Sequence, residues 1–144
     1  MATPSNRQST GRICENFKLA SGTFVTVGDL RIAALNAVGG AVTDAVVCGE
    51  NQASVGLMFY PNPGLPPDAV REAVREGLVR FNARAKGAGG RVARALVLPD
   101  PPDPQSGEIT DKGYIAQSLA RQRRAAHLER LFAEPPPPDV MVFE

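Results

Sequence analysis

Several residue types are scarce in this sequence of 144 residues, which has no tryptophan, one histidine and two cysteines. Its formal net charge is only +1. The cysteines, Cys14 and Cys48, show neither a disulfide framework nor metal-ligand spacing, so we expect reduced thiols and no metal site. A charge this close to zero disfavours a broad nucleic-acid surface. His127 falls on the outer part of a predicted helix, and we give it no catalytic role.

Long apolar runs are missing as well. No stretch approaches the roughly 20 apolar residues of a membrane helix, and the polar segment 1–10 lacks the apolar centre of a signal peptide. We therefore predict a cytoplasmic protein without a membrane partner. The sequence also has no glycine-rich phosphate loop ending in Lys-Ser or Lys-Thr, so any nucleotide site would need residues from elsewhere.

The length fits one domain with a hydrophobic core of its own. Residues 1–10 mix Pro, Ser, Asn and Thr without apolar periodicity, which indicates a flexible tail or linker remnant. We place the domain at residues 11–134. A proline-rich tail at 135–144 follows, and its end could be disordered or could dock as an extended strand.

The domain begins with a β-hairpin, predicted over residues 12–26 because apolar residues flank a short Ser-Gly-Thr turn. A helix capped by Asp29 and ended by Gly39 comes next. Two apolar, β-branched runs at 42–47 and 55–60 predict neighbouring strands.

A helix is predicted after Pro66, because the apolar residues there recur at spacings of three and four. A strand at 92–98 and a last helix from about 115 to 132 follow, the helix with its arginines mainly on an exposed flank. The order is a β-hairpin followed by αββαβ and a C-terminal helix. It predicts an α+β fold with helices packed on a small mixed sheet.

Lys112 lies in a turn between the proline-rich loop 99–104 and the last helix. The prolines restrict the loop, and Gly113 allows a sharp bend of the backbone. An ammonium group there can contact two anionic groups, such as a carboxylate and a phosphate, and stabilise charge that develops between them. Taken by itself, however, a solvated lysine at the start of a helix is the commoner case.

Two motifs carry a family resemblance. The first is Gly11, Arg12, Glu15, Phe17, Lys18, Leu19, Gly22 and Val25; the second, after the αββαβ order, is the turn Thr110, Asp111, Lys112, Gly113, Tyr114 and Ile115. Together they resemble the C-terminal domain of acyl-adenylate-forming enzymes, and most closely the feruloyl-CoA synthetase type of acyl-CoA ligase. The resemblance extends over most of the chain, to about Phe132.

The resemblance implies a two-step ligase. A carboxylic acid first attacks ATP to give an acyl-adenylate and pyrophosphate, and coenzyme A then displaces AMP to give a thioester. Between the steps the small C-terminal domain rotates over a large N-terminal domain. By motif position, Lys112 matches the adenylation lysine and Arg12 the arginine that contacts the nucleotide. Lys18 and Gly22 match the thioester-step residues, and Cys14 falls at the hinge, where family members often carry Asp or Lys.

The same resemblance places the phosphate loop, the acid pocket and Mg in the N-terminal adenylation domain. We therefore expect a lid that needs this domain as its partner, with ATP and coenzyme A as substrates of the full enzyme and none bound to this chain alone. Self-association through the face that would meet the partner is also expected. The alternative is a stand-alone binding or regulatory module that keeps the fold without the chemistry.

Other candidates have simpler interpretations. Asp100, Asp103 and Asp111 could form a metal cluster, but the intervening prolines favour turn residues. The arginine-rich segment 121–130 could touch RNA, but it lacks aromatic stacking partners, and a solvated face is the stronger interpretation. Neither cysteine has a histidine at a nearby predicted position, so buried or bystander thiols are favoured over nucleophiles.

Overall fold

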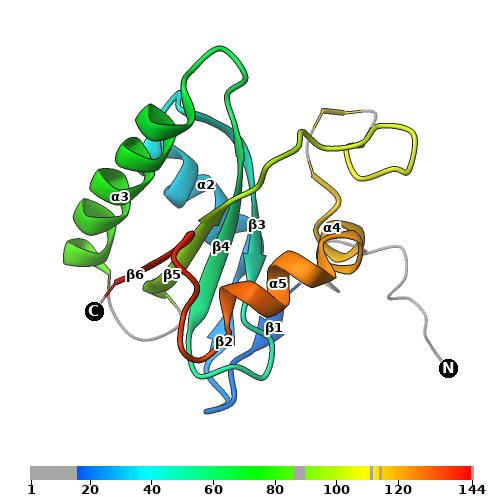
Figure 1. Ribbon diagram of the computed structural model, residues 1–144. Coiled ribbons are helices and arrows are strands. Elements are labelled where there is room, and N and C mark those ends of the chain that lie inside the picture. Colours follow the sequence, from blue (N-terminus) through cyan, green and yellow to red (C-terminus); the bar gives the residue numbers. More distant parts are fainter. Residues whose placement is uncertain (1–15, 86–89, 111, 114, 144) are drawn as a thin grey trace, which may run out of the picture.

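The computed structural model describes residues 16–85, 90–110, 112–113 and 115–143 (Figure 1). A two-stranded sheet is formed by β1 (Phe17–Lys18) and β2 (Phe24–Val25), and a four-stranded sheet has the order β3 (Val42–Cys48), β4 (Val55–Pro61), β5 (Val92–Val97) and β6 (Val140–Val142). The helices are α2 (Val27–Val38), α3 (Pro67–Arg84), α4 (Gln117–Arg123) and α5 (Ala125–Leu131). The predicted α+β fold, with helices packed on a small mixed sheet, is confirmed.

The large sheet is mixed because of how its strands are connected. A short turn joins β3 to β4, so they pair antiparallel, whereas α3 crosses over between β4 and β5 and makes that pair parallel. The end of the chain then returns as β6, antiparallel to β5, with Leu96 opposite Val140. The end of the tail, for which the sequence allowed either disorder or docking as a strand, therefore docks as a strand.

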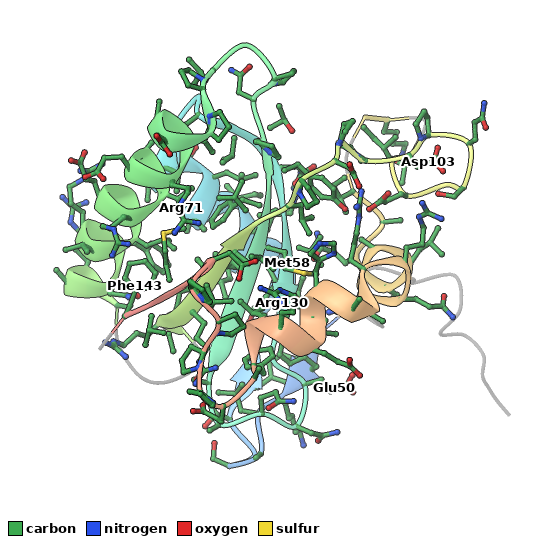
Figure 2. All side chains as sticks on the ribbon, viewed as in Figure 1. Glu50, Met58, Arg71, Asp103, Arg130 and Phe143 are labelled. Carbon is green, nitrogen blue, oxygen red and sulfur yellow. The ribbon has the colours of Figure 1, made fainter. Side chains whose placement is uncertain are left out.

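Helices cover both faces of this sheet (Figure 1). On one face, α2 and α3 pack over a core that includes Ala45, Leu57 and Phe59. On the other face, α4 and α5 lie over Val46, Met58 and Tyr60, and Met58 is labelled in Figure 2. Because β3 and β4 are covered on both sides, they appear in the sequence as continuous apolar runs and not as alternating ones.

Two details of the helices differ from expectation. Asp29 does not cap α2: the helix begins at Val27, and the side-chain oxygen of Asn16 accepts the Val27 N–H at 2.9 Å, while Asp29 lies in the first turn. Asn16, 11 residues before Val27, thus accepts the hydrogen bond at the start of the helix that a local capping residue was expected to accept. The last helix is divided, because Arg124 between α4 and α5 has φ −101° and ψ 29° and is itself buried.

The described residues contain neither a membrane-spanning helix nor a cluster of metal-binding side chains. Within those ranges no helix is both long enough and apolar enough to cross a membrane. The same part of the chain holds no group of three Asp, Glu, His or Cys side chains that could bind a metal ion. Asp111, one member of the acidic cluster considered above, lies outside the described residues.

Candidate functional site

Lys112 lies at the tip of a small hairpin. Ile109 and Ile115 form an antiparallel bridge, and the Gly113 N–H donates to the Thr110 carbonyl at 2.9 Å. Gly113 has a φ of 87°, a left-handed conformation that favours glycine, as predicted for a sharp bend here. Lys112 is exposed, and its side chain forms no hydrogen bond or ion pair with another described residue. The amine is therefore presented to the solvent, while its catalytic role stays a prediction.

Glu108 anchors the entry to this hairpin. Its side chain is completely buried, and Oε2 accepts hydrogen bonds from the Tyr60 hydroxyl and, at 2.9 Å, from Arg124 Nε. Its other oxygen, Oε1, accepts the backbone N–H of Asp103 at 2.8 Å. The Glu108 backbone carbonyl accepts the Ala116 N–H at 2.9 Å, which closes the base of the hairpin. One residue thus connects the hairpin, the proline-rich loop, β4 and the α4–α5 junction.

The charges in this cluster reinforce one another. Burial by itself would raise the pKa of the Glu108 carboxyl, but hydrogen bonds from Arg124, Tyr60 and the Asp103 N–H together lower it. Burial raises the pKa of the Tyr60 hydroxyl, and the neighbouring Glu108 carboxylate raises it further. At neutral pH the cluster therefore holds a carboxylate, a guanidinium and a neutral phenol whose hydroxyl donates a hydrogen bond to the carboxylate.

Asp44 anchors the exit from the hairpin. This residue of β3 is only 4% exposed and forms a two-pronged ion pair with Arg31 of α2, at 2.6 Å to Nε and 2.9 Å to Nη2. Its Oδ2 also accepts the Ile115 N–H at 3.2 Å. The two ends of the hairpin are thus held by two buried carboxylates from different parts of the fold.

The chain after the hairpin covers the free edge of β3. Gln117 accepts the Val47 N–H at 2.9 Å and donates to the Ala45 carbonyl at 2.9 Å, so its amide side chain pairs with the edge as a neighbouring strand would. Arg121 Nη1 donates to the Val47 carbonyl at 3.0 Å. The edge is therefore sealed against pairing with another chain, and α4 is fixed beside the hairpin.

Lys18 and Gly22 lie on the other hairpin, formed by β1 and β2. Gly22 occupies the turn with φ 89°, and Lys18 is exposed. Backbone hydrogen bonds fasten this hairpin to the turn after β3, from Ala20 N to the Gln52 carbonyl at 2.8 Å and from Asn51 N to the Lys18 carbonyl at 3.1 Å. A hollow of about 410 Å³ lies beside it, lined in part by Phe17, Ser118 and Phe132.

The structure does not bring Lys112 and Lys18 together. The Lys112 hairpin is attached near the beginning of β3, through Asp44, whereas the β1–β2 hairpin is attached to the turn after its end. In Figure 2, Asp103 marks the projecting loop that leads to Lys112, and Glu50 lies toward the β1 end of the sheet. The two lysines therefore lie at different ends of one strand.

The remaining candidates from the sequence are Arg12, the two cysteines and the arginine-rich helix. Arg12 and Cys14 lie outside the described residues. Burial raises the pKa of the Cys48 thiol to about 12, although Arg121 opposes the rise, so this thiol is protonated at neutral pH, as expected for a buried bystander. The prediction of an exposed arginine flank is wrong for Arg124, which is 8% exposed because its guanidinium pairs with buried Glu108.

The anchoring residues were not identified from the sequence. For Asp44 a signal exists, because it is the one charged residue inside the apolar run of β3 and a charge there needs a partner. Glu108 and Arg124 carry no such signal, since each stands among other polar residues in a loop or an arginine-rich helix. Tyr60 and Gln117 are likewise ordinary in their local sequence.

Comparisons with known proteins agree with this architecture. The family model for the AMP-binding enzyme C-terminal domain matches residues 33–135. Among solved structures, the adenylation domain of a carboxylate reductase from Mycobacterium chelonae has a TM-score of 0.66 at 22% identity, over 84% of this chain and 20% of that chain. The A-PCP didomain of a carboxylic acid reductase from Segniliparus rugosus, in complex with AMP, has a TM-score of 0.64 at 23% identity, over 83% of this chain and 17% of that chain.

The search of curated proteins found no match. The two solved structures share the fold of this chain, which spans only about a fifth of their length.

Proposed function

We propose that this chain, which belongs to the family of AMP-binding enzyme C-terminal domains, is the lid domain of an ATP-dependent acyl-CoA ligase similar to feruloyl-CoA synthetase. The observation that carries the proposal is the exposed Lys112 at the tip of a hairpin whose two ends are held by buried carboxylates. An N-terminal adenylation domain would supply the acid pocket, the phosphate loop and Mg. The lid would supply the ammonium group.

In the first step, a carboxylate oxygen of the substrate attacks the α-phosphorus of ATP. The bond from this phosphorus to the bridging oxygen breaks, and pyrophosphate leaves with the electron pair. Two anionic groups must approach each other for this to happen, so an ammonium group between them lowers their repulsion and stabilises the charge of the transition state. Lys112 can do this because nothing among the described residues neutralises it or holds it back.

In the second step, the thiolate sulfur of coenzyme A attacks the acyl carbon and the bond to AMP breaks, while the thiol proton passes to solvent. We assign Lys18 and Gly22 to this step, Arg12 to the nucleotide and Cys14 to the hinge. The position of Lys18 and Lys112 at different ends of β3 supports a lid that turns between the steps, since one orientation would present one lysine and another orientation the other.

The test joins this chain to its N-terminal adenylation domain and measures ATP–pyrophosphate exchange. We expect Lys112→Ala to lower exchange by about 100-fold or more, the scale of removing one charge-stabilising donor. Arg130→Ala is the control, because this exposed cation on α5 pairs with Asp139 at the surface. Unchanged exchange in Lys112→Ala would remove the residue from the adenylation step.

A different acyl acceptor is the main competing function, because the two similar solved structures are adenylating parts of carboxylate reductases. Supplying the joined protein with acyl-adenylate and coenzyme A distinguishes the two. Thioester formation that slows in Lys18→Ala supports the ligase, and its absence in the unaltered protein favours another acceptor.

The stand-alone module is tested by calorimetry on the isolated chain. Tight binding of coenzyme A by this chain would contradict a lid that depends on a partner domain.

A further inference from the structure

We propose that Glu108 and Arg124 are positioning residues for Lys112, and that their buried ion pair sets where the ammonium group stands relative to the rest of the lid. This inference rests on the proposed role of Lys112 in adenylation. It adds residues that touch neither substrate nor nucleotide and act through the hairpin.

The Lys112 hairpin is attached to the fold through its base. Lys112 is three residues from Ile109 and from Ile115, whose bridge closes the hairpin, and below that bridge the base is the bond from Ala116 N–H to the Glu108 carbonyl. The backbone of Glu108 is therefore part of the hairpin, while its side chain lies in the interior against Tyr60 and Arg124. A shift of Glu108 moves the base on which Lys112 stands.

The guanidinium of Arg124 holds both ends of the loop that precedes the hairpin. Arg124 Nη2 donates to the Pro101 carbonyl at 2.9 Å, and Arg124 Nε donates to Glu108. Glu108 in turn accepts the Asp103 N–H. Glu108 is the one buried residue of the loop from Pro101 to Glu108, and these polar contacts attach the loop to the α4–α5 junction.

Glu108 and Arg124 are both buried, at 0% and 8% exposed, and their 2.9 Å contact is closer than the 3.5 Å contacts that Arg123 makes with Glu108 and Asp100 makes with Arg124. Removing one charge therefore takes from the other its nearest partner in the interior. A buried ion pair is often no more stabilising than an apolar pair of the same size, but it requires a specific geometry. We infer that this pair serves to fix the geometry of the Lys112 hairpin.

The segment that follows Lys112 has attachments to β3 that do not involve Glu108. Asp44 holds Ile115, and Gln117 holds the edge of β3, whatever happens at Glu108. An isosteric change at Glu108 is therefore expected to displace the entry side of the hairpin, while its exit at Ile115, α4 and the sheet stay in place.

The experiment uses the joined enzyme and compares Glu108→Gln with Glu129→Gln, a matched change at an exposed glutamate of α5. Two quantities are measured: kcat and KM for ATP in pyrophosphate exchange, and the rate of thioester formation from supplied acyl-adenylate. We expect Glu108→Gln to lower kcat for exchange on the order of 100-fold, because a displacement of about 1 Å in a reacting group can cost that much. KM for ATP and the thioester rate should stay at the values of the Glu129→Gln control.

A purely structural role predicts a different result, since the same lid serves both steps. Equal losses in exchange and thioester formation would overturn the positioning role, as would an exchange rate equal to that of the control. Lys112→Ala separates the two proposals. If Lys112→Ala abolishes exchange while Glu108→Gln does not, only the positioning role fails; if Lys112→Ala has no effect, the proposed function itself fails.

A second variant covers the case in which Glu108→Gln does not fold. Tyr60→Phe removes only the hydroxyl that donates to Glu108 and keeps the ring packed in the core. Hydrogen exchange on the full chain should then show faster exchange of the Ala116 amide, with the amides that pair β3 and β4 unchanged. Ala116 protection equal to that of the unaltered chain would overturn the proposal.

Discussion

The two hairpins of this protein are attached to the fold in different ways. The Lys112 hairpin adds two buried carboxylates, Glu108 at its entry and Asp44 at its exit, to the apolar contact of Ile115 with the core. The β1–β2 hairpin depends on apolar side chains, because Phe17, Leu19 and Val25 are all buried in the main core. Apolar contacts are tolerant of small displacements, whereas hydrogen-bonded ion pairs are directional. The difference suggests that position matters most at Lys112.

The largest effect is expected from leaving one charge of the Glu108 cluster unpaired. Arg124→Met keeps most of the side-chain volume but leaves the buried Glu108 carboxylate with only the longer, 3.5 Å contact to the half-exposed Arg123, which should cost up to about 3–5 kcal/mol of unfolding free energy. Urea unfolding of the chain measures this. The double variant Glu108→Gln/Arg124→Met should recover much of the loss, and no recovery would mean that the charge is not the cause.

The apolar hairpin is tested by Leu19→Ala. Leu19 is 2% exposed, and truncating a buried leucine should cost about 2–5 kcal/mol, by lost burial and by the cavity left behind. Leu65→Ala, at an exposed leucine, is the control. The comparison of the two hairpins would be wrong if Leu19→Ala slowed pyrophosphate exchange as strongly as Glu108→Gln does.

Gln117→Ala should have a smaller effect. Its two hydrogen bonds to the outer edge of β3 are buried, and their loss leaves the Val47 N–H and the Ala45 carbonyl unpaired, at a cost of about 1–3 kcal/mol. Light scattering should also show more self-association, because the open edge can pair with another chain. Gln122→Ala, at an exposed position of the same helix, should change neither quantity.

The smallest but most diagnostic effect is the pH dependence. Because the folded pKa of Glu108 is below its ordinary value of 4.5, its ion pair contributes stability above that value and loses it as the pH falls through the folded pKa. The melting temperature of the unaltered chain should therefore fall in acid more steeply than that of Glu108→Gln, whose amide does not titrate. Parallel curves for the two proteins would show that Glu108 is not charged in the folded state.

Much of the fold can be predicted from local patterns. The apolar runs at 42–47 and 55–60 become β3 and β4, and the spacing of apolar residues after Pro66 becomes α3. The turn at Lys112 is also predictable, because the preceding prolines restrict the backbone and Gly113 can adopt the left-handed conformation that a sharp bend requires. Family resemblance points to the lysine itself, and the structure places it on an exposed turn.

Local patterns fail where partners are far apart in the chain. Arg121, Arg123, Arg124 and Arg130 look alike in sequence, yet Arg124 is the one buried against Glu108, 16 residues away. The local sequence favours Asp29 as the cap of α2, but Asn16, which immediately precedes β1, accepts the hydrogen bond from the Val27 N–H at the start of the helix.

Short-range preferences of the backbone and the pattern of the apolar residues were therefore enough to specify strands β3, β4 and β5, helix α3 and the turn that carries Lys112. The packing of the chain alone selects which carboxylate meets which guanidinium, where the last helix divides and that the tail completes the sheet as β6. The physical reason is that charge pairing and edge-strand pairing depend on distance in space, and neither leaves a periodic trace in the sequence.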